Sequence, residues 1–223
     1  MSSPSAYTAA VAGSTGAVGR NLVAELVSST KCAKVIALTR REIPEDQWPA
    51  SFPQLDLETA KSKLEVCKVD FEQITADDLK RSEKIDAAFW CLGTTRKESV
   101  TPEGFRKVDL EYATRFGKAS KGANATYFGI LTTMGAHPDS WFLYGQTKGE
   151  AEENIKKLGF ERTGIFRPGF IDRAEMSRPI EKVLHWILPS ISTRSIARSM
   201  LKDFEDGTSS VTEWSNGDMK KTQ

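Results

Sequence analysis

The stretch WFLYGQTKGE at residues 141–150 contains a Tyr-x-x-x-Lys pair, Tyr144 and Lys148. Residues at i and i+4 of a helix lie on one face, so a helix here would place the lysine ammonium beside the phenol. A free tyrosine has a pKa of about 10, and a neighbouring positive charge lowers it. Such a phenol can give or take a proton near neutral pH. Alone the motif is weak, because chance also produces it.

Two threonines, Thr132 and Thr133, lie eleven to twelve residues before Tyr144 and directly follow the apolar run ATYFGIL (125–131). If this run is a strand and the Tyr144 segment opens the next helix, both hydroxyls lie at the same edge of a sheet as the phenol. A threonine hydroxyl there would hold the oxygen of a substrate while Tyr144 moves the proton.

A glycine-rich turn, VAGSTGAVGR, follows the first apolar run and precedes an amphipathic stretch. Its glycines have the spacing of a turn that lets backbone approach a pyrophosphate at a helix N-terminus. The alternative is a glycine-rich connection that binds nothing, and the placement between strand and helix favours binding. The predicted phosphate-binding residues are Gly13, Ser14, Thr15, Gly16, Ala17, Val18 and Gly19.

The second predicted strand ends in LTRRE, with Arg40 and Arg41 at the position where a dinucleotide ribose is recognised. Arginine matches a 2′-phosphate, whereas Asp or Glu matches a free ribose hydroxyl. This pattern favours NADP(H), that is NADPH/NADP+, over NAD(H). The alternative is a solvated basic pair, and Glu42 comes late for a ribose contact.

Two further strand ends carry candidate cofactor contacts. Asp70, in KVDFE at the end of the third strand, is predicted to accept a hydrogen bond from the adenine amino group, or else to cap a turn. Leu92 and Gly93, in CLGTTR, end the fourth strand, and the glycine lets backbone pass close to the cofactor. The polar residues after Gly93 are as consistent with turn capping as with substrate contact.

These sites lie on alternating strand and helix candidates. Apolar runs at 8–13, 34–38, 63–69, 86–92, 125–131 and 161–169 alternate with helices at about 17–28, 101–122 and 144–158. The pattern predicts an α/β fold, a single doubly wound Rossmann domain with a parallel sheet of six or more strands. A short C-terminal helical appendage would contain helices at 179–189 and 192–205. We expect a core at about 7–169, a substrate or cap region at about 170–206, a loose tail at 207–223, and a loop at 41–59.

Composition excludes several classes. The 223 residues carry a formal net charge of +1, with no long basic run, so direct nucleic-acid binding is not expected. No apolar stretch approaches the ~20 residues of a transmembrane segment. Three widely spaced cysteines and two histidines predict neither a disulfide framework nor a metal site.

Together these residues resemble the short-chain dehydrogenase/reductase superfamily. The resemblance covers residues 8–180 and includes Gly13, Gly16, Gly19, Asp70, Gly93, Thr133, Tyr144-x-x-x-Lys148 and the FRPG run at 166–169. The stretches CLGTTR, GAHPDS, KGEAEE, FRPG and DRAEMSRP look like its Tat-interacting protein subfamily, which includes fungal proteins of the mitochondrial outer membrane. The departures are threonine in place of the usual catalytic serine and CLGTTR in place of an N-A-G run.

The resemblance implies an NADPH-binding Rossmann fold with Tyr144 as proton donor or acceptor. Lys148 would be its partner and a ribose contact, and Thr133 the catalytic hydroxyl. It also implies Arg40 and Arg41 at the 2′-phosphate, and cofactor-side positions at Ile171 and Arg178.

Two functions follow from the sequence. The first is an NADPH-dependent oxidoreductase acting on a small carbonyl or alcohol. The alternative is a non-catalytic NADPH-binding regulator that acts through a protein partner. We expect a cytoplasmic protein, with peripheral attachment to the mitochondrial outer membrane as the alternative.

Overall fold

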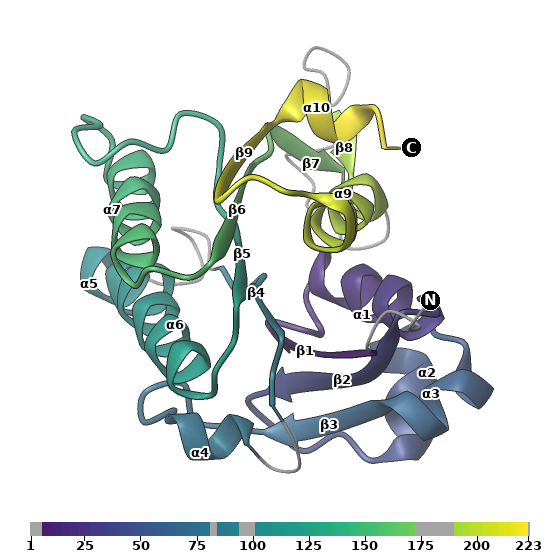
Figure 1. Ribbon diagram of the computed structural model, residues 1–223. Helices are drawn as coiled ribbons and strands as arrows, with labels where there is room; N and C mark the ends of the chain where they lie inside the picture. The colour runs from purple at the N-terminus through teal and green to yellow at the C-terminus, as the bar shows by residue number, and fades with distance from the viewer. Residues whose placement is uncertain (1–5, 81–83, 94–100, 173–189, 223) are drawn as a thin grey trace.

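A seven-stranded parallel sheet with helices on both faces forms the body of the protein (Figure 1). The computed structural model describes residues 6–80, 84–93, 101–172 and 190–222. The strand order is β3-β2-β1-β4-β5-β6-β9. The predicted α/β doubly wound fold is confirmed, because strand–helix alternation places successive parallel strands beside one another through right-handed crossovers.

The elements have the following bounds in chain order. The strands are β1 (Tyr7–Ala12), β2 (Cys32–Thr39), β3 (Leu64–Lys68), β4 (Ala87–Trp90), β5 (Tyr127–Leu131), β6 (Arg162–Arg167), β7 (Phe170–Asp172), β8 (Ser190–Ser192) and β9 (Val211–Ser215). The helices are α1 (Gly19–Ser28), η1 (Glu45–Gln47), α2 (Trp48–Ser51), α3 (Leu57–Lys63), α4 (Ala76–Leu79), α5 (Pro102–Arg106), η2 (Lys107–Tyr112), α6 (Ala113–Gly122), α7 (Leu143–Lys157), α9 (Thr193–Asp206) and α10 (Asn216–Lys220).

The core has two halves, one on each face of the sheet. Side chains of β1 alternate between them: Ala9 and Val11 belong to the half under α1 and α9, and Ala10 and Ala12 to the half under α6 and α7. Both faces of each central strand are therefore apolar, which explains the nearly continuous apolar runs in the sequence.

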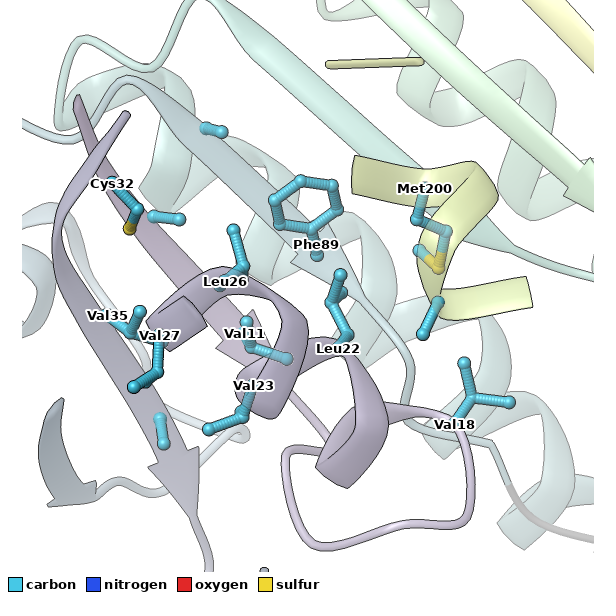
Figure 2. Packing of buried hydrophobic residues seen from close by; sticks show 14 of the residues in the cluster. Val11, Val18, Leu22, Val23, Leu26, Val27, Cys32, Val35, Phe89 and Met200 are labelled. Carbon is cyan, nitrogen blue, oxygen red and sulfur yellow. The ribbon is translucent and has the colours of Figure 1, made fainter. Parts of the chain in front are cut away.

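Helix α1 is fixed by the apolar stripe that its sequence shows. Leu22 and Leu26 are fully buried with Phe89 of β4 and Met200 of α9 (Figure 2). Each leucine buried in this way contributes about 1.5–3 kcal/mol relative to exposure. The stripe holds the start of α1 against the sheet, and the glycine turn precedes that start.

The helix predicted over 101–122 is present as α5, η2 and α6 in succession. Thr101 caps its N-terminus, since its side chain accepts a hydrogen bond from the N–H of Gly104, and Pro102 takes the first turn. The middle, η2, is π-helical. Short π-helical segments are rare and occur often at functional sites.

Two predictions for irregular segments are wrong. The tail at 207–223 is not loose over 211–220: β9 pairs in parallel with β6, and α10 follows it. The segment at 41–59 contains η1, α2 and the start of α3. In it Asp56 caps α3, and Trp48 and Phe52 are buried, so tertiary packing orders a segment with little periodicity.

In the C-terminal region, the helix predicted at 192–205 is confirmed as α9. Strand β7 pairs with β8 in a separate two-stranded sheet. The predicted helix at 179–189 lies outside the described residues, and the division into core and cap stays a prediction. Within the described part of the chain, no helix is long and apolar enough to cross a membrane.

Candidate functional site

A cavity of about 610 Å³ opens at the carboxyl ends of the sheet strands. The strand order reverses between β1 and β4, and such a switch point is where doubly wound sheets bind ligands. The cavity is lined by Gly13, Thr15, Gly16, Ala17, Val18, Leu38, Thr39, Arg40, Phe71, Cys91, Leu92, Gly93, Val108, Tyr112, Leu131, Thr132, Tyr144, Lys148 and Ile171. Most of the predicted cofactor contacts are therefore brought together.

The glycine turn fits its predicted role sterically. Gly13 has φ of +74°, and a Cβ there would overlap the backbone of Leu92. A Cβ on Gly19 would overlap the carbonyl oxygen of Gly13. Glycine at these two positions therefore lets the turn lie against the segment after β4 and against the start of α1, as the spacing predicts.

Ser14 lies in the turn but not in the cavity lining. Its side chain is fully buried, and its hydroxyl donates to the carbonyl oxygen of Leu38 at 3.0 Å. The hydrogen bond ties the turn to the end of β2, where the arginines follow. Ser14 therefore holds the turn in place, and its predicted ligand contact stays a prediction.

Both arginines lie at the β2 end of the site. Arg40 lines the main cavity, and Arg40 and Arg41 line an adjoining cavity of about 340 Å³. Both side chains are exposed. Glu42, which could have indicated a ribose contact, instead forms an ion pair with Lys68 at 3.6 Å.

Asp70 caps a turn. Its carboxylate accepts a hydrogen bond from the N–H of Glu72 at 2.9 Å, and the side chain is exposed. The next residue, Phe71, lines the cavity instead. The structure shows the capping role, and the adenine contact stays a prediction.

Tyr144 lies in the first turn of α7 and lines the cavity. Its ring stacks on that of Phe105 from α5, with centroids 5.4 Å apart and an interplanar angle of 23°. The side chain is 41% exposed. Phe105 is buried, so it fixes one face of the tyrosine while the other side stays open.

Lys148 lies one turn further along α7 and is buried. Its Nζ is 2.6 Å from Oδ1 of Asp109 on η2, and both side chains are almost inaccessible to solvent. Burial alone would lower the pKa of Lys148, but the charges of Asp109 and Tyr144 outweigh it and hold this pKa above the usual value. The lysine is therefore an ammonium at neutral pH.

Gly93 lies beside this ion pair. A Cβ at position 93 would lie 3.4 Å from both Nζ of Lys148 and Oδ1 of Asp109. The glycine at the end of β4 therefore borders the charged pair as well as the cavity. A Cβ at this distance would be in ordinary van der Waals contact, so the ion pair does not by itself require a glycine here.

Sequence reasoning missed Asp109. The spacing contained a signal for it. Asp109 lies four residues after Phe105 and three and seven residues before Tyr112 and Phe116, which places it on the apolar face of the predicted helix. A carboxylate on an otherwise apolar helix face needs a buried partner. Asp109 and Lys148 supply each other with one.

The two threonines after β5 differ in their partners. Thr132 lines the cavity, and its hydroxyl donates to Oε1 of buried Glu152 at 2.6 Å. Thr133 is half-buried and lies outside the lining, and its carbonyl oxygen accepts from the N–H of Ala136. The catalytic role of Thr133 stays a prediction.

A second charged group, also missed, stabilises this edge. Arg167 at the end of β6 holds Glu152 with two nitrogens at 2.6 and 3.0 Å, and contacts Glu213 of β9 at 2.8 Å. Glu152 thus links α7 to the ends of β5 and β6. The sequence signal was the opposite charges of the KGEAEE and FRPG runs. By themselves the two runs do not show which carboxylate meets the arginine.

Other reactive groups have ordinary structural surroundings. Burial raises the pKa of the Cys91 thiol to about 12, so the cysteine in the cavity lining is protonated at neutral pH. Among the described residues no cluster of three histidine, cysteine or acidic side chains could hold a metal ion. Arg178 lies outside the described residues.

Comparison with known proteins identifies relatives. No family profile matches the chain. The chain is 32% identical over 173 residues to Protein HTATIP2 of Rattus norvegicus, covering 77% of this chain and 66% of that protein. It is 32% identical over 196 residues to Protein fmp52, mitochondrial, of Emericella nidulans, covering 87% and 78%. The chain belongs to the HTATIP2 and FMP52 family.

Membership of the HTATIP2 and FMP52 family confirms the subfamily resemblance that the motifs carried. The chain spans just under two thirds of the rat protein's length. The fold is shared with the PhqB reductase domain of Penicillium fellutanum, with a TM-score of 0.74 at 15% identity over 97% of this chain and 68% of that one. UDP-glucuronic acid 4-epimerase of Bacillus cereus, solved with NAD, gives 0.67 at 15% over 92% and 77%.

Proposed function

We propose that this chain is an NADPH-dependent oxidoreductase that acts on a small carbonyl or alcohol. One observation carries the proposal: Tyr144 and Lys148 line the same cavity as the glycine turn and Arg40. The proposed proton-transfer pair and the proposed phosphate-binding elements would therefore face one ligand. The structural neighbour solved with NAD supports a nicotinamide dinucleotide in this position.

The cavity fits such a cofactor. Gly13 lets the turn lie against Leu92, and Gly93 keeps the cavity wall low beside the charged pair. Glycine N–H groups and the start of α1 suit a pyrophosphate. Arg40 and Arg41 would hold a 2′-phosphate. When bound, NADPH supplies the hydride for a carbonyl.

The chain's own residues would handle the proton and the substrate oxygen. Tyr144 would donate its phenolic proton to the carbonyl oxygen in reduction, and accept a proton in oxidation. Lys148 would stabilise the phenolate by its charge and contact the ribose. A hydroxyl at Thr133 would hold the same substrate oxygen.

The first experiment follows NADPH oxidation with a broad panel of carbonyl compounds. Wild-type protein should turn over at least one compound, and Tyr144→Phe should lose the activity while it keeps NADPH affinity, because only the hydroxyl is removed. Tyr112→Phe, another tyrosine in the cavity lining, is the matched control and should stay active. If wild type and Tyr144→Phe are equally inert across the panel, the catalytic proposal fails.

A second experiment tests the cofactor. Arg40→Ala with Arg41→Ala should weaken NADPH binding by tenfold or more per arginine, because each charge-assisted hydrogen bond contributes about 1.5–3 kcal/mol. NADH affinity should change far less. Lys61→Ala, which removes an exposed cation of α3, is the control. Equal weakening of both cofactors would contradict the assignment.

A non-catalytic NADPH-binding regulator is the second candidate. The observation in its favour is the Asp109 carboxylate, which neutralises Lys148 and so reduces the effect of the ammonium on Tyr144. This candidate predicts NADPH-dependent binding to a protein partner by wild type and Tyr144→Phe alike. Binding that is identical with and without NADPH would exclude it.

We propose a cytoplasmic protein, with peripheral attachment to the mitochondrial surface as the alternative that the names of the fungal relatives support. Fractionation separates the two, because a peripheral protein sediments with mitochondria and is released by alkaline carbonate.

A further inference from the structure

Besides Tyr144, the described part of the cavity lining contains two aromatic side chains, Phe71 and Tyr112. They come from different elements, because Phe71 follows β3 and Tyr112 is the last residue of η2. Strand β3 pairs with β2, and Phe71 follows β3 as Arg40 follows β2. Phe71 and Arg40 therefore lie on the same side of the cavity, at the ends of neighbouring strands.

Tyr112 is joined to the segment that carries Phe71. Its hydroxyl donates to Oε2 of Glu72, the residue after Phe71, at 3.4 Å. Lys107, also on η2, places its Nζ 2.6 Å from Oε1 of the same carboxylate and 5.9 Å from the centroid of the Tyr112 ring. Arg115 of α6 donates to the carbonyl oxygen of Glu72. Through Glu72, the two aromatic side chains therefore line neighbouring parts of the cavity.

Both aromatic residues rest on the same half of the core. Phe71 is buried and packs edge-to-face on Trp90 of β4, with ring centroids 5.8 Å apart and an interplanar angle of 89°. Trp90 packs in turn on Phe116 of α6, with centroids 5.8 Å apart. Tyr112 is half-buried and packs against this cluster. Phe71 thus forms a fixed apolar floor, while the Tyr112 ring keeps an accessible surface.

The described part of the lining contains no carboxylate and no amide side chain. The oxygen of such a group is what typically accepts a hydrogen bond from an amino group such as that of adenine. Asp70 lies outside this lining, and its carboxylate accepts from the N–H of Glu72 at 2.9 Å. The Thr39 hydroxyl donates to the carbonyl oxygen of Arg41 at 2.7 Å. Near Phe71 the lining therefore offers apolar and aromatic surface to a ligand.

An aromatic base fits this surface. Arg40 is proposed above to hold the 2′-phosphate of the dinucleotide, and the base is attached to the same ribose as that phosphate. The base would therefore lie on the side of the cavity that Phe71 lines. Stacking on an aromatic side chain contributes to the affinity for every base, because each base has a π-face. Stacking alone does not distinguish one purine from another.

We propose that Phe71 and Tyr112 hold the base of the dinucleotide by aromatic contact, and that no described side chain reads the amino group of adenine. The inference rests on the proposed function, which places the dinucleotide in this cavity. It adds a specificity: the protein accepts a cofactor in which hypoxanthine replaces adenine. It also assigns base binding to the ring of Tyr112, and not to its hydroxyl or to Asp70.

The test is calorimetric binding of two matched dinucleotides to the full chain. NADP+ contains adenine, and deamino-NADP+ contains hypoxanthine, which has a carbonyl oxygen in place of the amino group. Wild-type protein should bind the two with affinities within about threefold of each other, because hypoxanthine keeps the stacking surface. A carboxylate that reads the amino group would instead favour NADP+ by about tenfold or more.

Four variants assign the contact. Tyr112→Ala should weaken the binding of both dinucleotides by about tenfold, because it removes the stacking surface. Tyr112→Phe keeps the ring and should bind both like wild type. Leu110→Ala is the matched control and should also bind like wild type, because Leu110 packs on the same cluster but lies outside the described lining. Asp70→Asn should leave the ratio of the two affinities unchanged.

Two results would overturn the inference. The first is a preference of about tenfold or more for NADP+ in the wild-type protein. If Asp70→Asn removes that preference, Asp70 reads the amino group. The second is weakening in Tyr112→Ala that is no larger than in Leu110→Ala. The comparison of the two dinucleotides uses wild-type protein, so it decides the specificity even where a variant fails to fold.

NADPH oxidation measured in parallel separates this inference from the proposed function. Equal binding of the two dinucleotides, without turnover of any carbonyl, keeps the inference and removes the catalytic role. Turnover that depends on Tyr144 and on adenine keeps the catalytic role and removes the inference. If the protein binds NAD(H) in place of NADP(H), NAD+ and deamino-NAD+ make the same comparison. Failure to bind any of these dinucleotides removes both proposals.

Discussion

The buried ion pair between Asp109 and Lys148 gives the sharpest stability prediction. Asp109→Asn keeps the shape of the side chain and removes its charge. Two unit charges 2.6 Å apart interact by about 6 kcal/mol at an effective dielectric constant of about 20. Desolvation offsets part of this, and loss of one partner of a buried pair typically costs about 3–5 kcal/mol. We expect Asp109→Asn to lower the free energy of unfolding by about 3 kcal/mol at pH 7, because asparagine keeps an acceptor oxygen.

Urea unfolding provides the measurement, with Glu150→Gln as the matched control. Arg106 and Glu150 are also 2.6 Å apart, but both side chains are about a third exposed. Solvent screening reduces such a pair to about 1 kcal/mol or less. The comparison therefore holds distance constant and varies burial.

The pH dependence provides an independent check. The pKa of Lys148 in the folded protein lies above the usual lysine value of 10.5, so the pair stabilises the fold below about pH 10.5. Its contribution is lost as the pH rises through the folded pKa. The difference in stability between wild type and Asp109→Asn should thus be constant near neutral pH and shrink above pH 10.5.

A double-mutant cycle with Lys148→Met decides the interpretation. Asp109→Asn should cost much less when Lys148 is already methionine, because no buried ammonium is then left unpaired. A coupling of about 1 kcal/mol or less, equal to that of the Arg106–Glu150 pair, would refute the reasoning.

Three further predictions concern the same edge of the sheet. Glu152→Gln should lower the free energy of unfolding by about 3 kcal/mol in urea titration, because it leaves the Arg167 guanidinium short of a buried partner. Gly149→Ala should lower the thermal midpoint and shift the amide NMR signals of residues 134–140, because the added Cβ would overlap the backbone of His137 and Pro138. Ala151→Gly is the control for helix propensity on the same helix: it should change the midpoint but leave those amide signals in place. Gly93→Ala should weaken NADPH binding about tenfold in calorimetry, because it adds a methyl group to the cavity lining. It should leave the midpoint nearly unchanged, since the new Cβ would lie 3.4 Å from the Lys148 pair, in ordinary contact.

Local sequence features were sufficient for much of the fold. The first six strands of the large sheet follow from apolar runs, because strands buried on both faces need apolar residues at every position. The glycine turn, Tyr144 and Lys148 were found from spacing. They lie in one cavity because parallel strands end at one edge of the sheet.

The tail could not be predicted in the same way. Strand β9 alternates between exposed and half-buried residues and has little apolar character of its own. It forms because the edge of β6 offers unpaired backbone groups, and because Trp214 reaches the buried Asp203 of α9 with its indole N–H at 2.9 Å. Asp203 lies 11 residues before Trp214, and β6 lies further back in the chain, before α9, so no short stretch of sequence contains both the strand and its partners.

The sequence by itself determined the chemistry at hand: a glycine turn, an arginine pair and a Tyr-x-x-x-Lys pair, each specified by residues within a few positions of one another. Only the tertiary structure decided which charges meet. Asp109 finds Lys148, and Glu152 finds Arg167, from different elements. Such pairing depends on how a helix is rotated and where a strand ends, and the packing of the whole core sets both.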